Sequence, residues 1–341
     1  MVRIAVAGGA GNVGQEVIDV LAATKKHEIL LLSRKDAPTG EELPPGVTWV
    51  KTNYEDLKGL IETLRGVDTV LSFIVAHADP GAVAQKKLID AAVRAGVRRF
   101  APSEWAMRVT LSPTRVLSLY YSHANLDLCR ARFDYMPWYE GKALIREYLK
   151  ELNKDKKILE YSLFQPGLFT DYLTYPYKST KHIHPMQTPI DFGSRRMLMV
   201  EGSEDVPITL TTAADLANVV ARAVEYEGEW PAVGGIKGDE LTIREVIDLG
   251  KKVRGEAFQV EKLKADDLKA GVVRATWLPR PDHPSYSTEQ VEALAEQLTA
   301  GITLGFASGA MSVSDEWNRL LPDYQFTKAG DYLVEAWRGK P

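Results

Sequence analysis

The chain is constrained most by a glycine-rich turn that joins a short apolar segment to an amphipathic one. Residues 1–7 read Met-Val-Arg-Ile-Ala-Val-Ala, residues 8–14 read Gly-Gly-Ala-Gly-Asn-Val-Gly, and a helix-period stretch follows at Gln15–Ala23. Glycine allows a tight turn and a close approach of the backbone to a pyrophosphate, whose charge the N-terminus of a helix favours. This strand–turn–helix context predicts a dinucleotide-binding turn.

Two glycine registers fit this turn. One is Gly9-x-Gly11-x-x-Gly14 and the other is Gly8-x-x-Gly11-x-x-Gly14. We prefer the second, because the apolar strand is predicted to end at residue 7. It assigns the nucleotide contacts to Gly8, Gly11, Asn12, Val13 and Gly14.

The first 105 residues alternate between two periodicities, which predicts a parallel sheet covered by helices on both faces. Short apolar runs rich in β-branched residues occur at Arg3–Ala7, Glu28–Leu32, Val47–Val50, Thr69–Ile74 and Arg99–Pro102. Helix-period stretches lie between them at Gln15–Ala23, Leu57–Leu64 and Val83–Ala95. The fold class we predict is α/β, a Rossmann-type doubly wound parallel sheet with a smaller, mainly C-terminal α/β substrate-binding region.

The second half of the chain is less regular. A helix is predicted at Tyr139–Leu152 and a buried strand at Leu159–Gln165, and later helices at Ala213–Tyr226, Ile243–Val253 and Thr288–Thr299. We therefore predict a nucleotide-binding domain at 1–165 and a substrate-binding region at 166–341. Some later segments, such as a strand at Val206–Leu210, are expected to return to the first sheet.

The end of the second predicted strand indicates which dinucleotide is bound. NAD-binding chains carry a carboxylate about 20 residues beyond the glycine turn, where it binds the ribose 2′-hydroxyl. This chain has Ser33, Arg34 and Lys35 there instead. A hydroxyl and two cations suit the 2′-phosphate of NADP, which a guanidinium can bind through two hydrogen bonds. The alternative is a solvated basic loop.

The composition of the chain limits which partners it can bind and in which cellular compartment it is expected. The net charge of −4 comes with no dense block of like charge, so we expect no nucleic-acid partner. No apolar run approaches the ~18–20 residues that span a bilayer, and residues 1–7 are too short for a signal peptide. Cys129 is the one cysteine, which excludes an internal disulfide. We expect a cytoplasmic protein without a membrane partner.

Several motifs together resemble one protein family. They are the turn at residues 8–14, Arg34, the stretch Gly96-Val97-Arg98-Arg99-Phe100-Ala101-Pro102-Ser103-Glu104-Trp105, Lys142 on a helix, and Gln165-Pro166-Gly167-Leu168-Phe169. The chain resembles the NmrA-like, isoflavone-reductase-like branch of the atypical short-chain dehydrogenases/reductases. The similarity covers roughly the first 250 residues, and the Pro-Ser-Glu-aromatic element is its most specific part.

The resemblance implies an NADPH-binding reductase and assigns roles to matching residues. Arg34 would bind the 2′-phosphate, and Lys142 would be the active-site general acid/base. Further cofactor contacts would come from Ser33, Lys35, Phe73, Ile74, Gln85, Lys142, Pro166 and Phe169. Phe169 and Tyr172 would border the substrate.

The chain departs from the Tyr-x-x-x-Lys pair that short-chain dehydrogenases carry on one helix face. Trp138 stands four residues before Lys142, and Tyr139 stands three before it. In one interpretation, Lys142 itself protonates the substrate, with a pKa lowered by burial. In another, Tyr139 supplies the proton. In a third, Lys142 only positions the cofactor ribose.

Other polar and aromatic residues near predicted strand ends are weaker candidates. Ser103 follows the strand at Arg99–Pro102, and it would either hold a substrate oxygen or cap a short helix. The aromatic residues suit either a core or a pocket for a flat substrate, and the substrate candidates are Trp105, Trp138, Phe169, Tyr172 and Tyr175. His182 and His184 lack a third ligand beside them, so we predict no metal site.

Two functions remain open from the sequence. The first is an NADPH-dependent reductase of an aromatic or conjugated carbonyl small molecule, such as a phenylpropanoid, isoflavonoid or polyketide-like metabolite. The second is an NADP-binding redox sensor that binds a partner protein without turnover, and the missing tyrosine four residues before Lys142 keeps it open. A homodimer is compatible with both.

Overall fold

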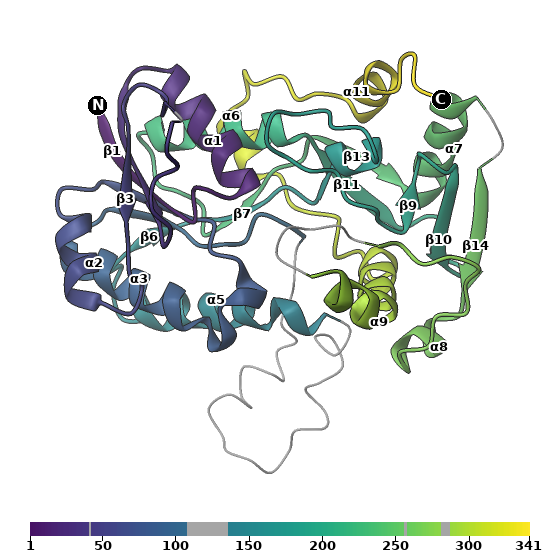
Figure 1. Ribbon diagram of the computed structural model, residues 1–341, viewed down its shortest axis with the longest axis horizontal. Coiled ribbons are helices and arrows are strands. Elements are labelled where there is room, and N and C mark those ends of the chain that lie inside the picture. The colour runs from purple at the N-terminus through teal and green to yellow at the C-terminus, as the bar shows by residue number, and fades with distance from the viewer. Residues whose placement is uncertain (41, 108–135, 256–257, 281–286) are drawn as a thin grey trace, which may run out of the picture.

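The computed structural model describes residues 1–40, 42–107, 136–255, 258–280 and 287–341 (Figure 1). Its largest sheet has six parallel strands in the spatial order β3-β2-β1-β4-β5-β6. They are β1 (Val2–Ala7), β2 (His27–Ser33), β3 (Val47–Lys51), β4 (Thr69–Ser72), β5 (Arg99–Ala101) and β6 (Glu160–Tyr161). The predicted Rossmann-type fold is confirmed. The strand order reverses between β1 and β4, and ligands of such sheets bind outside the carboxyl ends at this point.

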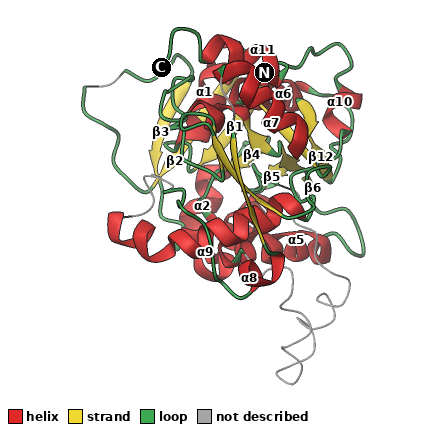
Figure 2. Ribbon diagram, turned by 90° about the vertical axis from the view of Figure 1, so that its right-hand side faces the viewer, coloured by secondary structure: helices red, strands yellow, loops and turns green. Residues whose placement is uncertain are grey.

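Helices cover both faces of this sheet, as Figure 2 shows. One face carries α1 (Asn12–Ala23) and α6 (Ala213–Glu225), and the other carries α2 (Leu57–Leu64), α3 (Val83–Ala95) and α5 (Glu140–Leu152). Each face of the sheet has its own hydrophobic core, and alternate residues of β1 point into the two cores. Ile4 and Val6 pack beneath α1, while Ala5 and Ala7 pack on the opposite side. This is the pattern of a strand buried on both faces.

The remaining strands form three small sheets. They pair β7 (Leu163–Gln165) with β12 (Val233–Gly235), β11 (Pro207–Thr211) with β8 (Leu168–Phe169) and β13 (Asp239–Thr242), and β10 (Arg196–Val200) with β9 (Ile190–Asp191) and β14 (Gln259–Leu263). The strand predicted at Val206–Leu210 is β11, but it joins a small sheet and not the first one. β12 pairs with β7, which follows β6 directly along the chain, but these two strands form a sheet of their own. The boundary at residue 165 stays a prediction.

The C-terminal segments pack against both halves of the molecule. The other helices are α7 (Ile243–Arg254), α8 (Ala265–Lys269), α9 (Thr288–Ala307), α10 (Glu316–Leu320) and α11 (Ala329–Ala336). Trp317 is fully buried in the core beneath α6, and the Tyr332 hydroxyl donates to the buried Asp171 carboxylate at 2.8 Å. Among the described helices, none is both long and apolar enough to cross a membrane.

Candidate functional site

The glycine turn closes tightly at the end of β1. The strand ends at Ala7, and Gly8 has a φ of +70°, a conformation that other residues rarely adopt. A Cβ at Gly8 would lie 2.8 Å from the carbonyl carbon of Phe73, and one at Gly14 would lie 2.9 Å from the Cα of Gly9. Gly11 is the N-cap residue of α1, and because it has no side chain, it makes no capping hydrogen bond to the first N–H groups of the helix. The backbone is thus exposed to a ligand at the start of α1.

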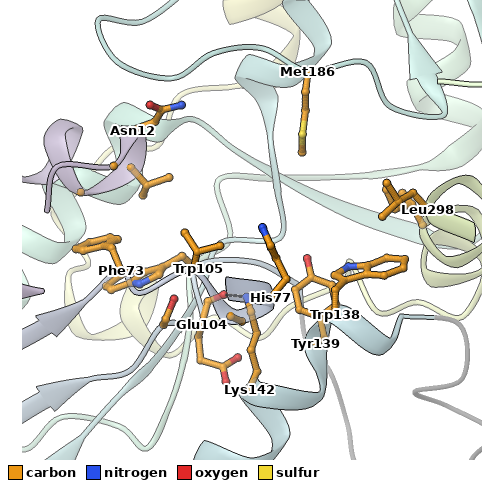
Figure 3. A pocket seen from close by; sticks show the side chains of 17 residues that line it. Asn12, Phe73, His77, Glu104, Trp105, Trp138, Tyr139, Lys142, Met186 and Leu298 are labelled. Atoms are coloured by element: carbon orange, nitrogen blue, oxygen red, sulfur yellow. Dashed lines mark hydrogen bonds between the residues drawn. The ribbon is translucent and has the colours of Figure 1, made fainter. Parts of the chain in front are cut away.

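A cavity of about 360 Å³ lies between this turn and α5, at the carboxyl edge of the sheet (Figure 3). The turn contributes residues 11–14, the end of β4 contributes Phe73, and the loop after β5 contributes residues 103–105. Trp138 and Tyr139 come from the turn η3 (Pro137–Tyr139), and Lys142 comes from the first turn of α5. The structure therefore brings the predicted cofactor turn and the predicted catalytic residues to one cavity.

Lys142 is held in a buried position within this cavity. Its side chain is only 9% exposed, and its Nζ donates a hydrogen bond to the backbone carbonyl of Glu104. The same nitrogen lies 4.5 Å from the centroid of the Tyr139 ring. Burial lowers the pKa of Lys142 to about 8; the nearby Glu104 charge opposes this shift, and the Arg146 charge adds to it. A lysine of this pKa can exchange a proton near neutral pH.

A buried ion pair fixes the loop that holds Lys142. Nε of Arg146 donates to Oε1 of Glu104 at 2.8 Å, and Nη2 of Arg146 donates to Oε2 of the same carboxylate. Glu104 is 1% exposed and Arg146 is 6% exposed, so the pair is shielded from water. Arg146 follows Lys142 by four residues on the same face of α5. The Glu104 carboxylate is thus committed to Arg146, while its carbonyl receives Lys142.

Ser103 lines the cavity, and Gln85 supports it from behind. The Ser103 backbone N–H donates to Oε1 of the buried Gln85 side chain at 2.7 Å. Gln85 is not among the residues that line the cavity; it supports Ser103, and its contact with the cofactor stays a prediction. Residues 103–107 form no helix, which leaves the capping interpretation of Ser103 without support in the described part of this loop.

The aromatic candidates separate into two groups. Trp138 and Trp105 both line the cavity. Trp105 is stacked on Phe73 at 4.3 Å between ring centroids and donates from its indole nitrogen to the Ser72 carbonyl at 2.6 Å. Trp105 thus forms a wall that is 8% exposed. Five other predicted contacts do not line the cavity: Ile74, Pro166, Phe169, Tyr172 and Tyr175. Phe169 packs edge-on against Tyr172 at 5.7 Å between ring centroids, and their contact with the substrate stays a prediction.

The predicted phosphate-binding cations lie at the exposed end of β2, beside the glycine turn. The Gly8 N–H donates to the Leu32 carbonyl at 3.1 Å, so Ser33, Arg34 and Lys35 begin next to the turn. Ser33 is buried and accepts from the Lys35 N–H at 3.1 Å, whereas both cations are exposed. Asp36 pairs with Lys51 at 2.7 Å. No described residue forms an ion pair with Arg34 or Lys35.

Some residues of the site carry no recognisable pattern in the sequence. His77, Met186, Leu298 and Ile302 line the cavity, from segments distant along the chain. Arg146, by contrast, has a recognisable signal in the sequence. It is a second cation on the apolar face of the helix, four residues after Lys142, and a buried cation needs a partner of opposite charge.

Three other sequence features have structural outcomes. The Thr212 hydroxyl accepts from the Asp215 N–H at 3.0 Å and thereby caps α6. His182 lies 2.9 Å from the Asp19 carboxylate, and the described residues contain no cluster of three metal-ligand side chains. Cys129 lies outside the described residues.

Comparison with known proteins identifies the family. The sequence model of the NmrA-like family matches residues 2–300. The chain belongs to the NmrA-like family. The predicted resemblance is therefore confirmed, and it extends beyond residue 250 to residue 300. Among curated relatives, oxidoreductase swnN of Metarhizium robertsii is 29% identical over 286 residues, covering 82% of this chain and 81% of the relative. Oxidoreductase BOA1 of Botryotinia fuckeliana is 31% identical over 76% of this chain and 78% of its own length.

Solved structures share the fold at low sequence identity. The NADPH-dependent quinone oxidoreductase QOR2 of Escherichia coli, complexed with NADPH, has a TM-score of 0.64 at 19% identity and covers 98% of this chain and 99% of its own. AtPrR2 with NADP+ and (+)pinoresinol has a TM-score of 0.64 at 18% identity, with 98% of each chain covered. At these identities the likeness establishes the fold.

Proposed function

We propose that the chain is an NADPH-dependent reductase of an aromatic or conjugated carbonyl small molecule. One observation carries this proposal: a single cavity joins the glycine turn at the start of α1 to the buried Lys142. The names of the relatives support it, because two are oxidoreductases and the structural neighbours include NADP(H) complexes of reductases.

The residues present fit NADPH, which supplies a hydride when it is bound. Gly8 and Gly14 leave room that a Cβ would fill, and the free N–H groups at the start of α1 favour a pyrophosphate. Arg34 would bind the 2′-phosphate, because Asp36 beside it is already paired with Lys51. The proposed cofactor contacts are Gly8, Gly11, Asn12, Val13, Gly14, Arg34, Lys35 and Phe73.

Lys142 is the proposed proton donor to the acceptor oxygen. Its pKa of about 8 keeps it mainly protonated at neutral pH, yet makes it a better acid than an exposed lysine. One of its three N–H bonds is used by the Glu104 carbonyl, which orients the other two. Ser103 can bind the same oxygen as a hydroxyl donor, and the apolar walls around Phe73 and Trp138 suit a flat ring.

A second function is favoured by a specific observation. Trp138 occupies the position of the tyrosine in Tyr-x-x-x-Lys, and Lys142 already donates to a backbone carbonyl. Such a site can bind a dinucleotide without turnover, as a sensor with a protein partner would.

Turnover separates these functions. Purified protein would be mixed with NADPH and a panel of aromatic enones and quinones, and the absorbance of the reduced nicotinamide followed. We expect consumption with some acceptors and a loss of about 100-fold in kcat for Lys142→Met. Lys150→Met, on the exposed side of the same helix, is the matched control. Tyr139→Phe should retain activity if Lys142 is the donor. Binding of NADPH without consumption across the panel would favour the sensor.

A further inference from the structure

Residues 181–186 form a strap that runs beside α1 and ends over the cavity. The backbone N–H of His182 donates to Oε1 of Glu16 at 2.6 Å. The N–H of Ile183 is shared between the same Glu16 oxygen at 3.2 Å and the Thr180 hydroxyl at 3.1 Å. Nε2 of His182 lies 2.9 Å from Oδ2 of Asp19, and the Lys181 ammonium pairs with the same oxygen at 2.5 Å. Two successive carboxylates of α1 therefore hold this segment.

The strap and the nucleotide turn share one helix. Asn12, Glu16 and Asp19 are spaced by four and three residues, which places them on one face of α1. Asn12 lines the cavity, while Glu16 and Asp19 bind the strap one and two turns further along. Ile183 is 2% exposed and packs into the core beneath α1, which anchors the middle of the strap.

Met186 is the part of the strap that reaches the site. It lines the cavity and points into it from the side opposite Lys142 (Figure 3). A methionine thioether makes favourable contacts with aromatic rings and adapts to their shape. The path of the strap thus sets the space between Met186 and Lys142, where a flat ring would lie.

We propose that Glu16 is a positioning residue for this cavity, acting through the strap. Glu16 binds the backbone of His182 and Ile183, and it therefore fixes the path of the chain three to four residues before Met186. Asp19 contributes less to that path, because it holds side chains and its partner Lys181 is 69% exposed. This inference rests on the proposed function, since the position of Met186 matters when a ring is bound. A displacement of about 1 Å in a bound reactant can lower a rate by about 100-fold.

The test compares three variants. Glu16→Ala removes the acceptor, whereas Glu16→Gln keeps an oxygen that can accept both N–H groups. Glu62→Ala is the control, because Glu62 is an exposed residue of α2 paired with Arg65. Three quantities are measured: kcat/KM for the best acceptor, the Kd of NADPH, and the ¹³C-methyl NMR signal of Met186, assigned with Met186→Leu.

We expect Glu16→Ala to shift the Met186 signal and to lower kcat/KM by about tenfold or more. Glu16→Gln should stay within about threefold of the wild type, and Glu62→Ala should match it. Kinetics are recorded well below the unfolding temperature of each variant, so that lost stability alone does not lower the rate.

An unmoved Met186 signal in Glu16→Ala, or a moved signal with wild-type kcat/KM and Kd, would overturn the proposal. A loss as large in Glu16→Gln as in Glu16→Ala would also overturn it, because the acceptor oxygen is retained. If the wild-type protein bound no NADPH, the proposed function would be wrong, and the Met186 signal would still decide whether Glu16 holds the strap.

Discussion

Replacing Lys142 by methionine is expected to stabilise the protein most near neutral pH. Burial lowers the pKa of Lys142 from 10.5 to about 8, and unfolding returns it to its ordinary value. Between these values the unfolded chain binds more protons than the folded chain, so this group makes the wild type more stable as the pH rises. At ~1.36 kcal/mol per pH unit, the buried charge disfavours folding by roughly 3 kcal/mol near pH 7 and by roughly 1 kcal/mol near pH 10.

Methionine removes this charge, but it leaves the Glu104 carbonyl without its donor, at roughly 1–3 kcal/mol. The lost hydrogen bond affects both ends of this pH range alike. The gain in unfolding free energy of Lys142→Met over the wild type should therefore fall by about 2 kcal/mol from pH 7 to pH 10. Urea unfolding followed by tryptophan fluorescence measures this difference at each pH. Lys150→Met, whose side chain is 60% exposed in the wild type, should show no such trend. A difference that stays constant with pH would refute the lowered pKa.

Three further substitutions test the nucleotide turn and the buried pair. Arg34→Ala should raise the Kd of NADPH about tenfold or more and leave that of NADH nearly unchanged, because only NADPH carries the 2′-phosphate; equal weakening in titrations would contradict this role. Gly8→Ala would place a Cβ 2.8 Å from the Phe73 carbonyl carbon, so NADPH affinity and about 1–3 kcal/mol of stability should be lost; a folded variant with wild-type affinity would rule out the turn. Glu104→Gln leaves Arg146 buried without its carboxylate and should lower the unfolding free energy by about 3–5 kcal/mol. Replacing both Glu104 and Arg146 by methionine should recover most of this lost stability. Chemical unfolding measures the free energy of both variants.

Local sequence signals were sufficient to predict the bounds of helices whose ends are set by capping residues. The predicted bounds Leu57–Leu64 and Val83–Ala95 are those of α2 and α3. The Asp56 side chain caps the first helix, and Gly96 ends the second with a φ of +78°. The fourth strand was predicted to reach Ile74 but ends at Ser72, because its pairing with β1 stops where Ala7 faces Ser72. Sheet register, which no local pattern encodes, decides that boundary.

The cavity itself was only half predictable. Its floor follows the strand ends and the first turn of α5, so Ser103 and Lys142 could be placed from their positions after predicted elements. Its other wall comes from Met186, Leu298 and Ile302, whose apolar side chains have the sequence character of core residues. Tertiary contacts select them, whereas Phe169 and Tyr172, which pack edge-on against each other, are not among the residues that line the cavity. Aromatic enrichment alone therefore does not identify which residues line the cavity.

The two proton donors considered from the sequence are not independent in the structure. Nζ of Lys142 lies 4.5 Å from the centroid of the Tyr139 ring, so the ring supports the charge whether or not its hydroxyl donates. Removing the whole Tyr139 side chain would change the environment of Lys142 as well as delete a hydroxyl. Tyr139→Phe keeps the ring and isolates the hydroxyl, while Lys142→Met keeps the length of the chain and isolates the ammonium. Because the effects of groups in contact are not additive, a double-mutant cycle between these two conservative changes measures how strongly the hydroxyl and the ammonium depend on each other.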